Sequence, residues 1–121
     1  MTFLPLRDDF VEQVAPARTF AFESEVPQIL RSGLGAGGSL ENALILGTTG
    51  ALNREGLRFP DEPVRHKLLD AMGDLFLLGG LPWATITLIK PGHSLMGLLA
   101  RQTAPLCSPI GAGTVEGRRA I

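Results

Sequence analysis

The amino-acid sequence predicts an α+β fold in which short helices are interleaved with strands. Apolar residues recur at three- and four-residue steps through residues 61–80, as in an amphipathic helix. By contrast, residues 17–22, 40–46 and 82–90 are short runs rich in strand-forming side chains. The 15 glycines and 9 prolines favour tight turns between these segments. Because three strands are too few for a complete sheet, we expect part of a larger layered structure.

Composition limits the classes of protein that the chain can belong to. Hydrophobic residues make up 45% and charged residues 19% of the 121 residues, as in a globular domain. The net charge of -1 argues against a nucleic-acid partner. The single cysteine, Cys107, excludes an internal disulfide and indicates a reducing compartment. No apolar run reaches the roughly 18–20 residues of a membrane span, and no signal peptide is recognisable, so we expect a cytoplasmic protein.

The elements that precede the main helix are predicted to be short. Residues 6–15 carry apolar side chains on one side of a helix. Residues 24–32 are expected to form a second helix with Ser24 as its N-cap. The strand predicted over residues 40–46 is followed by a turn at residues 47–50.

The longest predicted helix runs from Asp61 to Gly80. Asp61 can cap its N-terminus, and Gly79, Gly80 and Pro82 end it. One broad apolar face is expected to pack against the rest of the fold. This face consists of Val64, Leu68, Leu69, Met72, Leu75 and Phe76.

A polar stripe runs beside this apolar face. His66, Asp70 and Asp74 are each four residues apart, with Lys67 on the flank of the stripe. An imidazole and a carboxylate at i and i+4 can bind one metal ion. The same spacing also occurs on ordinary solvated helix faces, so the pattern alone leaves both interpretations open.

The segment after the main helix is predicted to be a strand over residues 82–90, followed by a helix over residues 93–101. His93 therefore lies at a strand-to-helix junction, where a histidine is commonly a surface residue, although reactive groups also occur there.

Residues 1–102 are predicted to fold. Residues 103–121 show no periodicity and are predicted to be a disordered tail.

Four sequence segments occur together and in order: ARTF at 17–20, GGSLENA at 37–43, LNREGLRFPDEPVRHKLLDAMGDL at 52–75, and the predicted strand with KPGHS that ends at Ser94. This combination resembles the C-terminal half of UDP-3-O-acyl-N-acetylglucosamine deacetylase, the zinc hydrolase of lipid A synthesis in Gram-negative bacteria. The resemblance implies two α+β domains packed face to face, each a sheet with helices on one face, with the active site between them. This chain would be a partial second domain.

The resemblance also implies roles for five polar residues. His66 and Asp70 would be two zinc ligands, in agreement with their spacing. Asp74 would hold His93 protonated, so that His93 acts as general acid and electrostatic stabiliser. Thr19 would hydrogen-bond the oxyanion that forms when water attacks the acyl carbonyl.

Substrate contacts follow from the same resemblance. Phe20 would pack against the sugar, and Lys67 and Lys90 would face the nucleotide diphosphate. The segment of residues 22–46 matches the insert that builds the acyl-chain passage of the family. Three apolar residues would line this passage: Val26, Leu40 and Ile45.

The resemblance further implies an N-terminal domain with a third zinc ligand and the glutamate base, and none of the segments quoted above matches that domain. We therefore expect one zinc ion with an incomplete ligand set. His93 or Cys107 are the candidates for completing it, although the resemblance gives His93 another role. The family reaction converts UDP-3-O-acyl-N-acetylglucosamine to UDP-3-O-acyl-glucosamine and acetate. We expect this chain to carry half of that active site and to be inactive without the N-terminal domain, in cis or in trans.

Two other functions stay open at this point. The chain could be a non-catalytic module that binds a UDP-sugar or lipid, or a degenerate fragment. Nucleotide binding that survives chelation and His66→Ala would favour the binding module. The chain could also be one half of a split enzyme, in which case an apolar face prone to self-association is expected.

Overall fold

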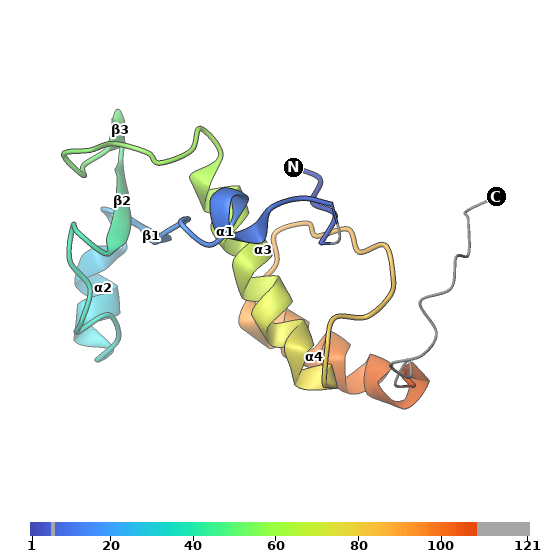
Figure 1. Cartoon of the computed structure of the whole chain (residues 1–121). Helices are drawn as coiled ribbons and strands as arrows, with labels where there is room; N and C mark the ends of the chain where they lie inside the picture. Colours follow the sequence, from blue (N-terminus) through green and yellow to red (C-terminus); the bar gives the residue numbers. More distant parts are fainter. Residues whose placement is uncertain (6, 109–121) are drawn as a thin grey trace.

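The computed structural model describes residues 1–5 and 7–108, and its combination of a three-stranded mixed sheet with separate helices confirms the α+β class (Figure 1). No helix among these residues is long and apolar enough to cross a membrane. The elements, in chain order, are α1 (Phe10–Gln13), β1 (Thr19–Phe22), α2 (Val26–Arg31), β2 (Ala43–Gly47), β3 (Gly50–Ala51), α3 (Glu62–Leu75), the 3-10 turn η1 (Phe76–Leu78), α4 (His93–Thr103) and the 3-10 turn η2 (Ala104–Leu106).

The sheet has the order β1-β2-β3. Strands β1 and β2 are parallel, and α2 provides the crossover between them. Strands β2 and β3 form a hairpin in which Gly47 pairs with Gly50. The side chain of Asn53, which follows β3, binds back to β2: it accepts from the Ile45 N–H at 2.9 Å and donates to the Ala43 carbonyl at 2.8 Å. Burial of Asn53 is therefore compensated by hydrogen bonds.

The two N-terminal helices are shorter than the sequence predicts. The first begins only at Phe10, because the carboxylate of Asp9 accepts the Glu12 N–H at 3.1 Å and caps the helix there. Leu6, which was expected on its apolar side, lies outside the described residues. The N-cap position of α2 is Glu25, so the prediction for Ser24 was wrong.

Helix α3 confirms the main predicted helix, with two differences. Asp61 occupies the N-cap position, but its Oδ1 is held by Arg65 Nε at 2.6 Å and caps no helix N–H. The helix tightens into η1 after Leu75. It ends at Gly79, whose φ of 90° is a left-handed conformation that suits glycine.

The largest core cluster lies where α4 packs on the C-terminal half of α3. Ala71 and Leu75 of α3 are buried there against Met96 of α4. The predicted apolar face is only partly covered, because Val64 is 51% and Phe76 57% exposed. The helix therefore buries a narrower stripe than its sequence pattern indicates.

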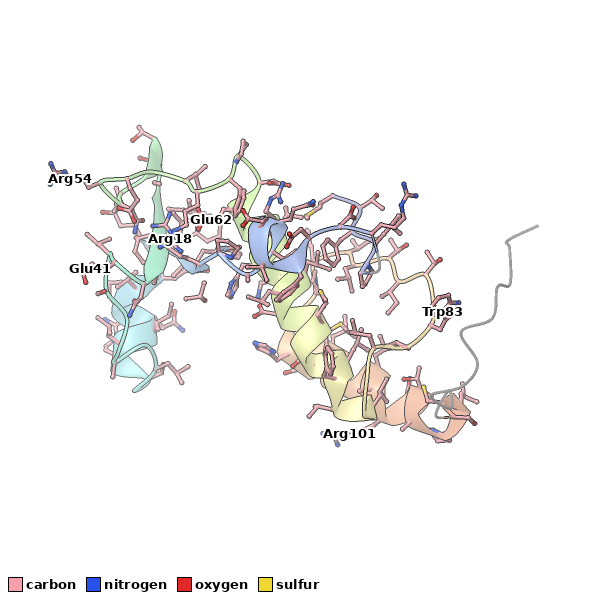
Figure 2. All side chains as sticks on the ribbon, in the orientation of Figure 1. Arg18, Glu41, Arg54, Glu62, Trp83 and Arg101 are labelled. Carbon is pink, nitrogen blue, oxygen red and sulfur yellow. The ribbon has the colours of Figure 1, made fainter. Side chains whose placement is uncertain are left out.

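Residues 82–90 do not form the predicted strand. The sheet contains none of them, and Trp83 and Ile89 are each 79% exposed. Figure 2 shows Trp83 on this loop. A strand requires a neighbouring backbone to complete its hydrogen bonds, and no described segment pairs with this one. Leu88 packs against the core cluster and anchors the loop. His93 therefore follows a loop rather than a strand.

The last helix, α4, runs two residues further than predicted. Thr103 belongs to it, and Ala104–Leu106 form η2, so the start of the predicted disordered tail is helical. Residues 109–121 of that tail lie outside the described residues.

Candidate active site

The polar stripe of α3 brings an imidazole and a carboxylate together. His66 Nε2 lies 3.3 Å from Asp70 Oδ1, one helical turn away. The other carboxylate oxygen of Asp70, Oδ2, accepts from Lys67 Nζ at 2.8 Å. The stripe is therefore an ordered, half-buried cluster rather than a freely solvated face.

The orientation of the His66 ring is set by a backbone carbonyl. Its Nδ1 lies 3.0 Å from the carbonyl oxygen of Ala17, just before β1. Because a carbonyl only accepts hydrogen bonds, Nδ1 carries the proton in this contact. In the neutral imidazole the lone pair of His66 is then on Nε2, the nitrogen beside Asp70. This is the arrangement that a histidine metal ligand commonly has.

A second imidazole approaches the stripe from α4. His93, the first residue of α4, places Nδ1 2.8 Å from Asp74 Oδ2 and 3.1 Å from Asp74 Oδ1. Its Nε2 lies 3.9 Å from Asp70 Oδ1. The His93 side chain remains 68% exposed, so this face of the cluster is open.

Two metal donors converge, but no larger set does. Across residues 1–5 and 7–108, no group of three or more His, Cys, Asp or Glu side chains is placed to hold a metal ion. Cys107 is exposed after η2 and belongs to no such group. His66 and Asp70 thus fit two positions of a metal's ligand set.

An open groove of about 670 Å³ gathers the three residues that were predicted to contact the substrate head group. Phe20, Lys67 and Lys90 line it together, and Lys67 Nζ lies 5.7 Å from the centroid of the Phe20 ring. The N-terminal segment of residues 1–5 forms another wall. Among the described residues, Lys90 is the one non-glycine residue with a positive φ, 49°, a conformation that is uncommon outside glycine.

The predicted acyl passage is spread over a different part of the fold. Val26 begins α2, Ile45 lies within β2, and Leu40 is 51% exposed in the loop between them. They line neither of the two cavities that surround α3. Gly35 has a φ of 69°, and a Cβ there would meet Ile29 at 3.2 Å, so backbone geometry accounts for this glycine. The passage stays a prediction.

The sequence pattern did not reveal a buried ion pair between the residue that precedes β1 and the start of α3. Arg18 is 4% exposed and Glu62 is completely buried, and Figure 2 shows both between the sheet and α3. Arg18 Nε donates to Glu62 Oε1 at 2.8 Å, and its Nη1 contacts Glu55. Arg18 belongs to the ARTF segment, and Glu62 is the second residue of the helix that the sequence predicts from Asp61. Their separation of 44 residues matches no local periodicity.

The ion pair controls the charge of Glu62. Burial acts to raise the pKa of the carboxyl group, but hydrogen bonds from the Arg18 side chain and from the N–H groups of Arg18 and Arg58 outweigh it. Together with the Arg18 charge they lower the pKa of Glu62 from 4.5 to about 2. In turn, the Glu62 hydrogen bond raises the pKa of Arg18. Both groups are therefore charged in the folded protein.

Comparison with known proteins identifies the family. The family model of UDP-3-O-acyl N-acetylglycosamine deacetylase matches residues 2–104. The chain belongs to this family.

Individual relatives agree with this assignment. A protein from a Synechocystis species is 48% identical over 85% of this chain and 37% of its own length. A protein from an Anaeromyxobacter species is 48% identical over 77% of this chain and 31% of its own length. A third, from Chromobacterium violaceum, is 46% identical over 79% of this chain and 32% of its own length. All three are named UDP-3-O-acyl-N-acetylglucosamine deacetylase, and this chain spans about a third of their length.

Proposed function

We propose that this chain carries part of the active site of a zinc-dependent UDP-3-O-acyl-N-acetylglucosamine deacetylase. The observation that supports this most directly is the approach of His66 Nε2 to Asp70 Oδ1, 3.3 Å apart, in a chain of this family. In this proposal His66 and Asp70 are two of the zinc ligands. The remaining ligand and the general base come from the N-terminal domain of the family, in cis or in trans.

The proposed reaction is hydrolysis of the 2-acetamido group. Water adds to the acetyl carbonyl carbon, the C–N bond breaks, and acetate and the free amine are released. A bound zinc ion would supply Lewis acidity toward the carbonyl and lower the pKa of water. His93, held by Asp74, would donate the proton that the leaving amine takes up. The hydroxyl of Thr19 would donate a hydrogen bond to the developing oxyanion.

The groove beside α3 is the proposed site for the substrate head group. Phe20 offers an aromatic face for the sugar, and Lys67 and Lys90 offer two ammonium groups for the diphosphate. Val26, Leu40 and Ile45 are the proposed contacts of the acyl chain, because they lie within the β1–α2–β2 unit that also contains Phe20.

The first test is the zinc affinity of the purified 121-residue chain, measured by competition with a chelator. His66→Ala and Asp70→Ala should each lower the affinity by at least about 10-fold, because each removes one donor. Glu41→Ala is the matched control, since this exposed carboxylate lies away from α3 (Figure 2). Equal affinity in all four proteins would contradict the proposed metal site.

The activity test separates the catalytic proposal from a binding module. The isolated chain should not release acetate from UDP-3-O-acyl-N-acetylglucosamine, because it supplies only two matched ligands. Robust zinc-dependent release by the chain alone would contradict this expectation. UDP binding that is unchanged by chelation and by His66→Ala would instead favour a non-catalytic nucleotide-binding module.

A further inference from the structure

The peptide unit between Ala17 and Arg18 is held by α3 at both of its polar ends. Its C=O accepts from His66 Nδ1 at 3.0 Å, and its N–H donates to Glu62 Oε1 at 3.0 Å. Glu62 and His66 are four residues apart, so their side chains lie on the same face of α3, one turn apart. Two side chains on one face of α3 therefore hydrogen-bond the two polar ends of a single planar peptide group. We call this arrangement the peptide clamp.

Glu62 is a rigid anchor for the peptide clamp. Its carboxylate is completely buried and accepts four hydrogen bonds. Three come from Arg18, through its backbone N–H, Nε and Nη2, and the fourth comes from the Arg58 N–H at 2.7 Å. The carboxylate cannot rotate without breaking several of these bonds inside a space that water does not reach.

We propose that Glu62 is a positioning residue that sets the tautomer of His66 through the Ala17–Arg18 peptide. A peptide group rotates as a unit, so fixing its N–H also aims its C=O. In the neutral imidazole the aimed carbonyl favours the His66 proton on Nδ1, which leaves the Nε2 lone pair beside Asp70. Accepting the N–H also polarises the peptide and strengthens its oxygen as an acceptor. The consequence for zinc binding rests on the metal role proposed above for His66.

The test compares two double variants of the whole chain by nitrogen NMR of the imidazole rings. Removing one member of a buried ion pair leaves the other charge without a partner, so both members are changed together. Arg18→Met with Glu62→Gln keeps an oxygen acceptor for the peptide N–H, whereas Arg18→Met with Glu62→Leu removes it. Tautomers are measured under alkaline conditions, where imidazole is neutral.

The chain contains an internal control, because it has only two histidines. His93 places its Nδ1 on Asp74 rather than on the peptide clamp, so its tautomer should be the same in every protein. His66 should keep its proton on Nδ1 in the wild type and the glutamine pair, and shift it toward Nε2 in the leucine pair. Zinc affinity should fall about 10- to 100-fold in the leucine pair only.

Three results would overturn the proposal. The first is a folded leucine pair that retains the Nδ1 proton on His66, because Glu62 would then be merely structural. The second is an equal shift in the glutamine pair. The third needs no variant: in the wild type, a His66 proton on Nε2 or a rapidly exchanging Arg18 amide contradicts the peptide clamp directly. This third measurement can overturn the proposal even if the leucine pair fails to fold.

The metal role and the peptide clamp fail separately. If His66→Ala does not change zinc affinity, the proposed metal site is contradicted. The shift of the His66 tautomer in the leucine pair still tests the role of Glu62 in that case. If zinc affinity depends on His66 but the His66 tautomer does not change with the residue at position 62, only the proposed role of the peptide clamp is contradicted.

Discussion

Glu62 combines complete burial with a full negative charge at the first position of α3. The helix N-terminus favours an anion, and Arg18 supplies a partner with several parallel hydrogen bonds. Such a pair is costly to break from one side, because the remaining charge stays buried. The stability of this region therefore depends on the protonation of one carboxylate.

The pH dependence of folding should report this carboxylate. The pKa of Glu62 is lowered from 4.5 to about 2, so its stabilisation is complete above pH 4.5 and is lost as pH falls through about 2. The size of the effect is roughly 3 kcal/mol in the free energy of unfolding. Denaturant unfolding across this pH window measures it.

Two variant proteins test whether this pH dependence belongs to Glu62: the double variant Arg18→Met with Glu62→Gln, and the single variant Asp61→Asn. The Arg18→Met and Glu62→Gln pair should flatten the loss of stability in that window. Asp61→Asn should flatten it less, because Arg65 lowers the pKa of Asp61 at a more exposed position. An unchanged slope in the glutamine pair would contradict the assignment to Glu62.

At the scale of elements, sequence patterns correctly predicted those helices and strands whose formation depends on neighbouring residues. The period of α3 and the short apolar runs of β1 and β2 are properties of neighbouring residues, and these elements form. Residues 82–90 have equally good strand-forming composition, but a strand depends on a partner that the segment itself does not encode. The i, i+4 spacing likewise brought His66 to Asp70.

Such local patterns could not predict contacts between segments that are distant in the sequence. The carbonyl of Ala17 that orients His66 has no side-chain signature, and the Arg18–Glu62 pair joins two motifs that look polar and exposed in the sequence. The approach of His93 to Asp74 was predicted only through the family resemblance.

The end of α3 offers a test with a matched control. Gly79 has a φ of 90°, whereas Gly80 lies outside the left-handed region, and a Cβ at either glycine would meet no atom within 4 Å. Gly79→Ala should therefore lower the free energy of unfolding by roughly 1 kcal/mol through backbone strain alone. Gly80→Ala should have little effect or stabilise slightly. Thermal unfolding of both variants checks this, and equal values would contradict the C-terminal geometry of the helix.

At the scale of the whole molecule, apolar side chains remain outside the core. Trp83, labelled in Figure 2, and Ile89 are exposed on the loop between η1 and α4, and Leu77 of η1 is 78% exposed. The structure covers a chain that spans about a third of its relatives. Exposed apolar side chains of this kind favour association between copies of the isolated chain.

Fluorescence can test this exposure, because Trp83 is the only tryptophan. In dilute solution its emission should be that of a solvated indole and should be quenched readily by iodide. Raising the protein concentration should shift the emission to shorter wavelength as copies associate. Trp83 cannot be substituted without losing the signal, so Ile89→Ser is the variant that should weaken the concentration dependence. Emission of a buried indole in dilute solution would contradict the position of this loop.

The peptide clamp has a consequence for the order of folding. Its two hydrogen bonds close loops of 44 and 49 residues, whereas the bonds of α3 close single turns. Closing a long loop costs chain entropy before any contact repays it, so local helix formation precedes these contacts. A chain can thus have a complete α3, with His66 and Asp70 correctly spaced, and still lack an oriented imidazole. We therefore expect the candidate site to form later in folding than α3 itself.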